Sequence, residues 1–185
     1  MKIVIITQND PFYLSSNLKF LLDNLPNKHK VVGVIVASAS PFGKKETFFQ
    51  KALKTKKIFG INFFIHYTFK FVYSKLFKPS LRNILNNFNI PEINIKGSIN
   101  FKKNLTIIDS YKPDLMVSIL GNQIFKKPLL ELAPKGCINL HTALLPKYRG
   151  LMPTFWVMKN NEKFTGVSVF FVDEGIDSGP IIVQE

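Results

Sequence analysis

Uninterrupted apolar runs alternate with stretches of helical periodicity over most of the chain. Such runs, rich in β-branched residues, are typical of strands buried on both faces, and they occur at 2–7, 31–38, 114–120 and 136–141. Apolar spacing predicts helices at 13–25, 44–58, 101–111 and within 121–134, and a short strand at 88–95. Because parallel strands are joined through crossovers, usually helical, this alternation predicts β-α-β units.

The pattern changes after residue 164, where FTGVSVFFVDEGIDSGPIIVQE reads as two strands around an acidic turn with no helix between them. The whole pattern predicts an α/β fold, namely a Rossmann-like open, mostly parallel twisted sheet with helices on both faces and a C-terminal strand pair. With 185 residues and a 46% hydrophobic composition, the chain is predicted to form a single domain over 1–185.

The segment IFGINFFIHYTFKFVYSKLF predicts an aromatic helical insertion at about 58–78. Four polar residues recur every fourth position, so the helix carries a narrow polar stripe beside a very wide apolar face: Asn62, His66, Lys70 and Ser74. Lysines inside the segment argue against a membrane span. We expect the insertion to pack on the domain or on a second subunit, which would make a homodimer. A helix lying in a membrane interface and a lid over the substrate are the less favoured alternatives.

The net charge of +13 does not by itself predict a nucleic-acid surface. Only two of the 25 basic residues are arginine, and the lysines are scattered along the chain with no RNA-binding signature. The single cysteine, Cys137, supports neither a disulfide framework nor a zinc site, and the three histidines are too far apart in sequence for a metal site. The N-terminus turns polar after six residues, too early for a secretion signal, so we expect a cytoplasmic protein.

Small or polar residues follow the predicted parallel strands, at the edge where open α/β sheets bind ligands: Thr7–Asp10, Ser38–Ser40, Gly121–Gln123 and Asn139–Thr142. Asn139 and His141 lie two residues apart in an extended strand, so their side chains point to the same side. A carboxylate from the DEGIDSG turn, 173–179, would fix the imidazole tautomer. Such a trio suits a reaction in which an oxygen becomes negative while an amine loses a proton. Each feature taken alone is more often structural, but together, with the Leu-Leu-Pro between them, they favour a catalytic site.

The stretch CINLHTALLPKYRGLMPTFWVM, followed by TGVSVFFVDEGIDSGPII, resembles the formyltransferase family that uses 10-formyltetrahydrofolate. The family pattern is Asn-x-His, then a small-Leu-Leu-Pro loop, then an aspartate in a Gly-x-Asp-[ST]-Gly turn. In this chain these positions are Asn139, His141, ALLP at 143–146 and Asp177. The resemblance is specific over 114–185, and the N-terminal half agrees only in its order of strands and helices. The family fold normally continues with at least one more helix, so we expect a chain truncated at its C-terminus.

The resemblance implies that Asn139 and protonated His141 stabilise the oxyanion of a tetrahedral intermediate, while Asp177 orients His141 and helps to relay a proton. It also implies 10-formyltetrahydrofolate as the formyl donor and no metal. Backbone groups of two segments are expected to contact the pterin: Leu120, Gly121, Asn122, Gln123 and Ile124, and Val172, Asp173, Glu174, Gly175 and Ile176. The acceptor or the folate tail is expected at Asp10, Lys147, Arg149 and Gly150.

The family resemblance leaves several acceptors open. The run KYRGLMP resembles the tRNA and sugar enzymes more than the purine-pathway pattern, yet the first strand is followed by TQNDPFY in place of the Gly-Thr-Pro turn of tRNA enzymes. The aromatic insertion resembles that of formyltransferase-like proteins of surface-polysaccharide synthesis. We therefore expect N-formylation of an amino group on a nucleotide-linked sugar or similar metabolite. The alternatives are a methionyl-tRNA formyltransferase, a formyltetrahydrofolate deformylase that uses water, and a non-catalytic folate-binding relative.

Overall fold

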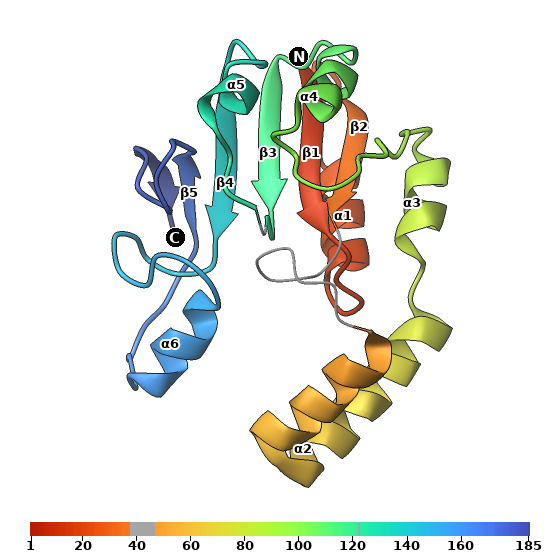
Figure 1. Cartoon of the computed structure of the whole chain (residues 1–185), viewed down its shortest axis with the longest axis vertical. Coiled ribbons are helices and arrows are strands. Elements are labelled where there is room, and N and C mark those ends of the chain that lie inside the picture. The colour runs from red at the N-terminus through yellow and green to blue at the C-terminus, as the bar shows by residue number, and fades with distance from the viewer. Residues whose placement is uncertain (38–46, 122) are drawn as a thin grey trace.

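Six strands form one open sheet in the computed structural model, which describes residues 1–37, 47–121 and 123–185 and, at 48 and 51, the backbone only. The spatial order is β2-β1-β3-β4-β5-β6 (Figure 1). The strands are β1 Lys2–Gln8, β2 Lys30–Ala37, β3 Leu115–Ile119, β4 Cys137–His141, β5 Ser168–Phe171 and β6 Ile181–Gln184. The first four are parallel to one another, and β5 and β6 each run antiparallel to the preceding strand. The predicted fold class is therefore confirmed.

Helices cover both faces of the parallel part of the sheet (Figure 1). They are α1 Leu14–Asp23, α2 Phe48–Phe77, α3 Leu81–Asn87, α4 Lys102–Asp109, α5 Lys127–Leu130 and α6 Pro153–Lys159. Strand β1 contributes to two hydrophobic cores because successive side chains in a strand point to opposite faces. Val4 and Ile6 pack with α4 and α5 residues, whereas Ile3 and Ile5 pack with α1 and α3 residues. This double burial explains the uninterrupted apolar sequence of β1.

The strand predicted at 88–95 is wrong, except for one parallel bridge between Val34 and Glu92. Pro91 has no N–H to donate to a ladder, so pairing along β2 cannot continue through it. The apolar residues of this segment serve the cores instead, since Ile90 and Ile93 are buried. The helix predicted at 44–58 begins at Phe48, and residues 44–46 of that prediction lie outside the described residues.

Helix α2 is two helices joined at Gly60, and they lie side by side as a hairpin (Figure 1). Gly60 has φ 82° and ψ 174°, a conformation that glycine adopts more readily than other residues. A capping box opens the first helix, with the Thr47 hydroxyl accepting from the Gln50 N–H and the Gln50 side chain accepting from the Thr47 N–H. Of the helices in the described residues, none is long and apolar enough to cross a bilayer.

At the contact between the hairpin and the domain, two polar residues of the second helix, Lys70 and Ser74, bond to the domain, whereas an amphipathic helix usually packs through its apolar face. The Ser74 hydroxyl is buried and donates to the Pro11 carbonyl, and Lys70 donates to the Tyr13 hydroxyl. Phe12 packs edge-on against Tyr67, with ring centroids 4.9 Å apart. The predicted packing on the domain is thus made by Lys70, Ser74 and aromatic neighbours such as Tyr67, and much of the wide apolar face stays exposed.

Cys137 is buried at the start of β4, and burial raises the pKa of its thiol to about 12. We predict that a thiol reagent at about pH 8 will not modify the folded protein, because the reactive thiolate form is almost absent there. The measurement is labelling with Ellman's reagent against the same chain in denaturant, where one thiol should react at once. Rapid labelling of the folded chain would contradict the burial that we describe.

Candidate functional site

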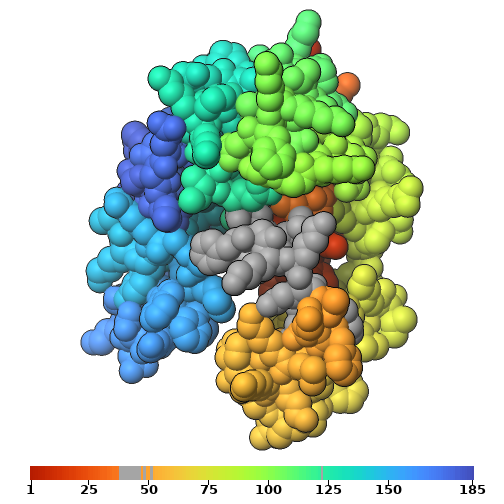
Figure 2. Space-filling model, in the orientation of Figure 1, coloured from red at the N-terminus to blue at the C-terminus, as the bar shows by residue number. Residues whose placement is uncertain are grey.

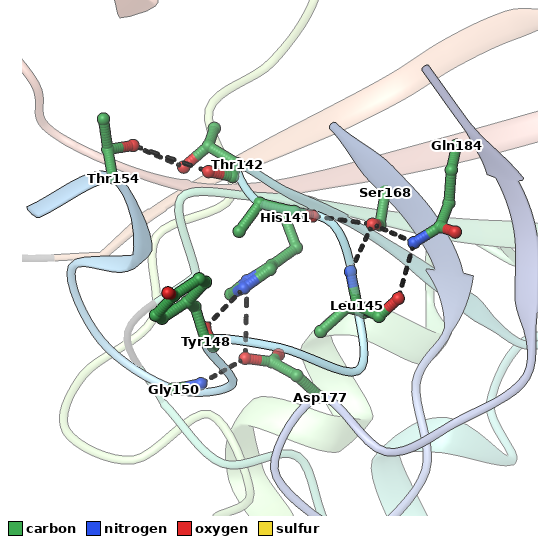
Figure 3. Close-up of polar contacts among 10 residues, drawn as sticks. His141, Thr142, Leu145, Tyr148, Gly150, Thr154, Ser168, Asp177 and Gln184 are labelled. Atoms are coloured by element: carbon green, nitrogen blue, oxygen red, sulfur yellow. Dashed lines mark hydrogen bonds and ion pairs between the residues drawn. The ribbon is translucent and has the colours of Figure 1, made fainter. Parts of the chain in front are cut away.

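His141 ends β4 with its ring buried and both ring nitrogens facing acceptors (Figure 3). Nε2 lies 2.9 Å from the Tyr148 carbonyl oxygen, and Nδ1 lies 3.4 Å from Asp177 Oδ2. The His141 and Asp177 side chains are only 6% and 17% exposed, so solvent screens this contact weakly. A carbonyl and an ionised carboxylate can only accept, so a ring protonated on both nitrogens satisfies both neighbours.

Asp177 reaches this position through a loop that crosses β4. The loop starts where the Val172 N–H donates to the Cys137 carbonyl at the first residue of β4. It ends where Asp177 Oδ2 accepts from the Gly150 N–H at 2.7 Å, beside the last residue of β4. Between these points the Glu174 carboxylate accepts from the Lys127 N–H at 3.2 Å, which ties the loop to α5. The acid therefore lies over the face of β4 that carries the His141 ring.

Backbone conformations with positive φ cluster around His141. Tyr148, Met152 and Asp177 have φ of 57°, 55° and 48°, and Gly150 has φ 93°. Non-glycine residues in the left-handed region are strained, and strain of this kind concentrates at functional sites. These turns bring the Tyr148 carbonyl to the His141 ring and the Gly150 N–H to the Asp177 carboxylate (Figure 3).

Ser168 anchors the loop that follows His141 (Figure 3). Its fully buried hydroxyl donates to the Ala143 carbonyl at 2.7 Å and accepts from the Leu145 N–H at 3.0 Å. The Gln184 amide donates to the same hydroxyl at 2.8 Å and to the Leu145 carbonyl at 2.9 Å. Strands β5 and β6 therefore hold the Leu-Leu-Pro loop in place, and the Leu145–Pro146 bond within it is cis.

Asn139 lies in the middle of β4, partly exposed, paired in register with Ser118 of β3 and Phe170 of β5. Two-residue spacing places it on the His141 side of the strand. Asn139 and His141 thus come from one strand and Asp177 from the loop that crosses it, so the three predicted catalytic residues lie in one region.

The two segments predicted to bind the pterin follow β3 and β5. Leu120 has φ 60° and is 38% exposed, and Ile176 is 58% exposed, so both offer apolar side chains. A Cβ added to Gly121 would come within 2.5 Å of Ser118 Oγ, which explains the glycine. Asn122 lies outside the described residues.

The remaining members of these segments are bonded within the chain. The Gln123 amide oxygen accepts from the Ile99 N–H, and the Ile124 carbonyl accepts from the Asn100 amide. Asp173 accepts from the Gly175 N–H and the Ser178 hydroxyl. Gln123 and Gly121 also border a cavity of about 10 Å³, which is large enough for about one water molecule.

Three of the four residues predicted to contact an acceptor, Asp10, Lys147 and Gly150, bond within the chain. Asp10 Oδ2 accepts three backbone N–H groups at 2.6–3.2 Å, from Phe12, Tyr13 and Leu14, and so caps the turn into α1. The Gly150 N–H is used by Asp177, and Arg149 is exposed. Lys147 Nζ lies 3.2 Å from Glu162 Oε1.

Glu162 contacts both Lys147 and Tyr148, in the loop that follows β4. The Tyr148 hydroxyl donates to its carboxylate at 2.6 Å, and this bond, followed by the Lys147 contacts, lowers the pKa of Glu162 below its ordinary value. A groove of about 430 Å³ lies beside them, bordered also by Val157, Lys163 and Phe164. The Tyr148 carbonyl and side chain therefore link this groove to His141.

Sequence reasoning missed Tyr148, Ser168 and Gln184. A signal existed for Ser168, since it occupies an inward position of β5, beside buried Phe170, where period-two alternation predicts an apolar residue. The Tyr148 contact runs through a backbone carbonyl and leaves no trace in residue type. Among the described residues, no three histidine, cysteine or acidic side chains group as they would around a metal ion.

Comparisons with known proteins identify the family of this chain. The family model described as formyl transferase matches residues 1–185. The methionyl-tRNA formyltransferase of Kosmotoga olearia is 38% identical over 111 residues, which is 60% of this chain and 35% of that protein. The enzyme of the same name from Desulfotalea psychrophila is 30% identical over 181 residues, covering 98% of this chain and 46% of that protein. The chain thus spans less than half the length of these relatives.

Solved structures show the same fold over the whole chain. Phosphoribosylglycinamide formyltransferase from Bacillus halodurans has a TM-score of 0.64 at 19% identity and covers 100% of this chain and 78% of its own. WlaRD, a sugar 3N-formyl transferase crystallised with dTDP and 5-N-formyl-THF, has a TM-score of 0.54 at 23% identity and covers 100% of this chain and 51% of its own. With the family model matching every residue, this chain belongs to the formyl transferase family.

Proposed function

We propose that this protein transfers a formyl group from 10-formyltetrahydrofolate to a primary amine. The observation that carries the proposal is the buried contact between His141 and Asp177, held by the Tyr148 carbonyl and the Gly150 N–H. A protonated imidazole fixed by a carboxylate is a proton donor in a defined orientation. The family model that matches the chain supports the same reaction type.

In the proposed mechanism the amine nitrogen attacks the formyl carbon and forms a new C–N bond. The carbonyl oxygen of the formyl group becomes an oxyanion, to which the Asn139 amide and the His141 ring donate. The amine loses a proton, the folate N10 gains one as its bond to the carbon breaks, and the oxyanion returns to a carbonyl. Asp177 orients His141 throughout. For Nε2 to reach the oxyanion, the ring has to exchange the Tyr148 carbonyl for the substrate oxygen.

The folate is proposed to lie beside β4, with its pterin between 120–124 and 172–176. Leu120 and Ile176 would contact the ring faces, since both side chains are exposed and apolar. Asn122, Asp173, Glu174 and the other members of the two segments would act mainly through backbone groups. This placement puts the transferable formyl group near Asn139 and His141.

The proposed acceptor is an amino group on a nucleotide-linked sugar or similar metabolite. The net charge of +13 favours an anionic acceptor, and Arg149 on the site loop is exposed to meet one. Methionyl-tRNA is the second candidate, because the relatives of higher identity carry that name. Asp10, Lys147 and Gly150 already bond within the chain, so any acceptor contact from them has to use their remaining polar groups or displace these bonds.

A formyl-transfer assay separates these acceptors. Purified protein with 10-formyltetrahydrofolate is given 3-amino and 4-amino nucleotide sugars, methionyl-tRNA, or water alone, and tetrahydrofolate release is followed with mass spectrometry of the acceptor. We expect an amino sugar to gain one formyl group. Formylation of methionyl-tRNA alone would replace the proposed acceptor, and release with water alone would identify a deformylase. Folate binding without turnover would identify a non-catalytic relative.

A further inference from the structure

The hairpin α2 exposes the face that an amphipathic helix normally buries. Ile61, Ile65, Phe69, Tyr73 and Phe77 follow one another every four residues and form one ridge along the second helix. Val72 and Leu76 lie beside this ridge, since each is three or seven residues from a member. Phe69, Leu76 and Phe77 are 70–73% exposed. Lys70 and Ser74, in the polar row next to the ridge, bond to the domain and so fix the outward direction of the ridge.

The ridge is large for a protein surface. Aromatic side chains offer roughly 150–250 Å² each, so Phe69, Tyr73 and Phe77, which are 59–73% exposed, present on the order of 400 Å². The four aliphatic residues on or beside the ridge, which are 47–71% exposed, add to this area. The largest apolar patch of a typical soluble monomer is roughly 300–600 Å², and larger ones mark interaction sites. The first helix adds exposed Phe49 at its start and exposed Ile58 next to the turn at Gly60. Figure 2 shows the hairpin, in orange and yellow, projecting from the body of the molecule.

The charge around the ridge has one sign. Residues 47–78 contain seven lysines and no aspartate or glutamate. Lys56 and Lys57 are exposed just before the turn, and Lys75 is exposed on the flank of the ridge. Lys75 Nζ lies 5.9 Å from the centre of the Phe71 ring, so its stem runs along the aromatic surface.

The apolar ridge and the lysines around it together indicate what kind of partner covers this face of the hairpin. A second copy docked by the same face would bring these lysines against lysines, which opposes association. An anionic bilayer matches both features, because its interface accepts aromatic and aliphatic side chains and its headgroups attract lysines. Each helix of the hairpin is too short and too basic to span, so the hairpin would lie in the interface plane.

We propose that the hairpin at 48–77 docks the protein on an anionic membrane surface, with the aromatic ridge in the interface and the lysines at the headgroups. The carboxyl ends of β1, β3 and β4 point toward the same end of the molecule as the hairpin (Figure 1). Docking in this way would bring the site edge close to the bilayer.

Sedimentation with vesicles tests the proposal without any formyl-transfer reaction. Vesicles of phosphatidylcholine with about 30% phosphatidylglycerol should bind the protein at least 10-fold more tightly than vesicles of phosphatidylcholine alone, and high salt should weaken the binding. The double variant Phe69→Ser/Phe77→Ser should lose binding by about 100-fold. The triple variant Lys56→Gln/Lys57→Gln/Lys75→Gln should lose about 10-fold on anionic vesicles only.

Matched controls use exposed residues away from the hairpin. Lys102→Gln/Lys103→Gln on α4 and Phe164→Ser, where the ring is 83% exposed, should leave vesicle binding within about twofold. Circular dichroism should show all variants folded, because every substituted side chain is exposed. Equal binding to neutral and anionic vesicles, or no binding to either, would overturn the proposal. A dimer in analytical ultracentrifugation that Phe69→Ser/Phe77→Ser dissociates would also overturn it, since a second copy would then cover the ridge.

Discussion

Replacing Asp177 with asparagine is expected to lower kcat for formyl transfer about 100- to 1,000-fold while the fold is retained. The asparagine oxygen can still accept the Gly150 N–H, so the loop keeps its anchor. The same oxygen position faces His141 Nδ1, so Nδ1 keeps an acceptor, but that acceptor no longer carries a charge. A neutral amide stabilises positive charge on the ring less well than a carboxylate does, so the variant weakens the protonated ring that the proposed mechanism uses.

Two measurements check this expectation. Steady-state kinetics should show the loss in kcat, and ¹⁵N chemical shifts of the His141 ring should move toward those of a neutral imidazole. The shift measurement does not depend on the acceptor. Asp109→Asn, an identical substitution at an exposed position of α4, should change neither. An Asp177→Asn variant with kcat within threefold of the parent, or with an unchanged ring, would refute the role given to Asp177.

Replacing Ser168 with alanine is expected to lower the free energy of unfolding by about 2–4 kcal/mol. The substitution leaves the Leu145 N–H and the Ala143 carbonyl without their partner in a fully buried position, at roughly 1–3 kcal/mol for each unsatisfied group. Such a loss is a large part of the roughly 5–15 kcal/mol that stabilises a typical domain. The Gln184 amide keeps its bond to the Leu145 carbonyl and limits the damage.

Urea denaturation followed by circular dichroism measures this change. The matched control is Ser110→Ala, where an exposed hydroxyl donates to the Ile107 carbonyl, and it should change stability by about 0.5 kcal/mol or less. A Ser168→Ala variant no less stable than this control would mean that the three bonds of the buried hydroxyl contribute little. The Leu-Leu-Pro loop would then be held by its apolar contacts alone.

The parallel sheet could be predicted from the sequence because each of its strands carries its own signal. Val4, Ile5 and Ile6 are apolar on both sides of β1, which only burial on both faces explains. The segment 88–95 has a similar apolar pattern, but the strand predicted there does not form. Pro91 limits its pairing with β2, and its residues Ile90 and Ile93 are buried in the two cores without joining the sheet. An apolar pattern shows which residues are buried, but it does not show whether a buried segment pairs with a neighbouring strand.

The candidate site, too, could be predicted only in part from the sequence. Asn139, His141 and Asp177 were predicted from motif spacing and a family resemblance, and residue type is enough for that purpose. The Tyr148 carbonyl and the Gly150 N–H are backbone groups, which every sequence contains, so no pattern could single them out. The three bonds of Ser168 join β5, β6 and a loop that are far apart in sequence, and they exist only once the strands are paired.

The hairpin α2 shows most clearly what the sequence determines and what only the tertiary structure decides. The sequence alone determined that 58–77 is helical, that its polar residues form one narrow row and that lysines accompany its aromatic residues. The tertiary structure alone decided that Gly60 folds the segment back and that Lys70 and Ser74 turn toward residues 11–13. The physical reason is that helical periodicity records which residues share a face, whereas the direction of that face depends on partners supplied by a distant part of the chain.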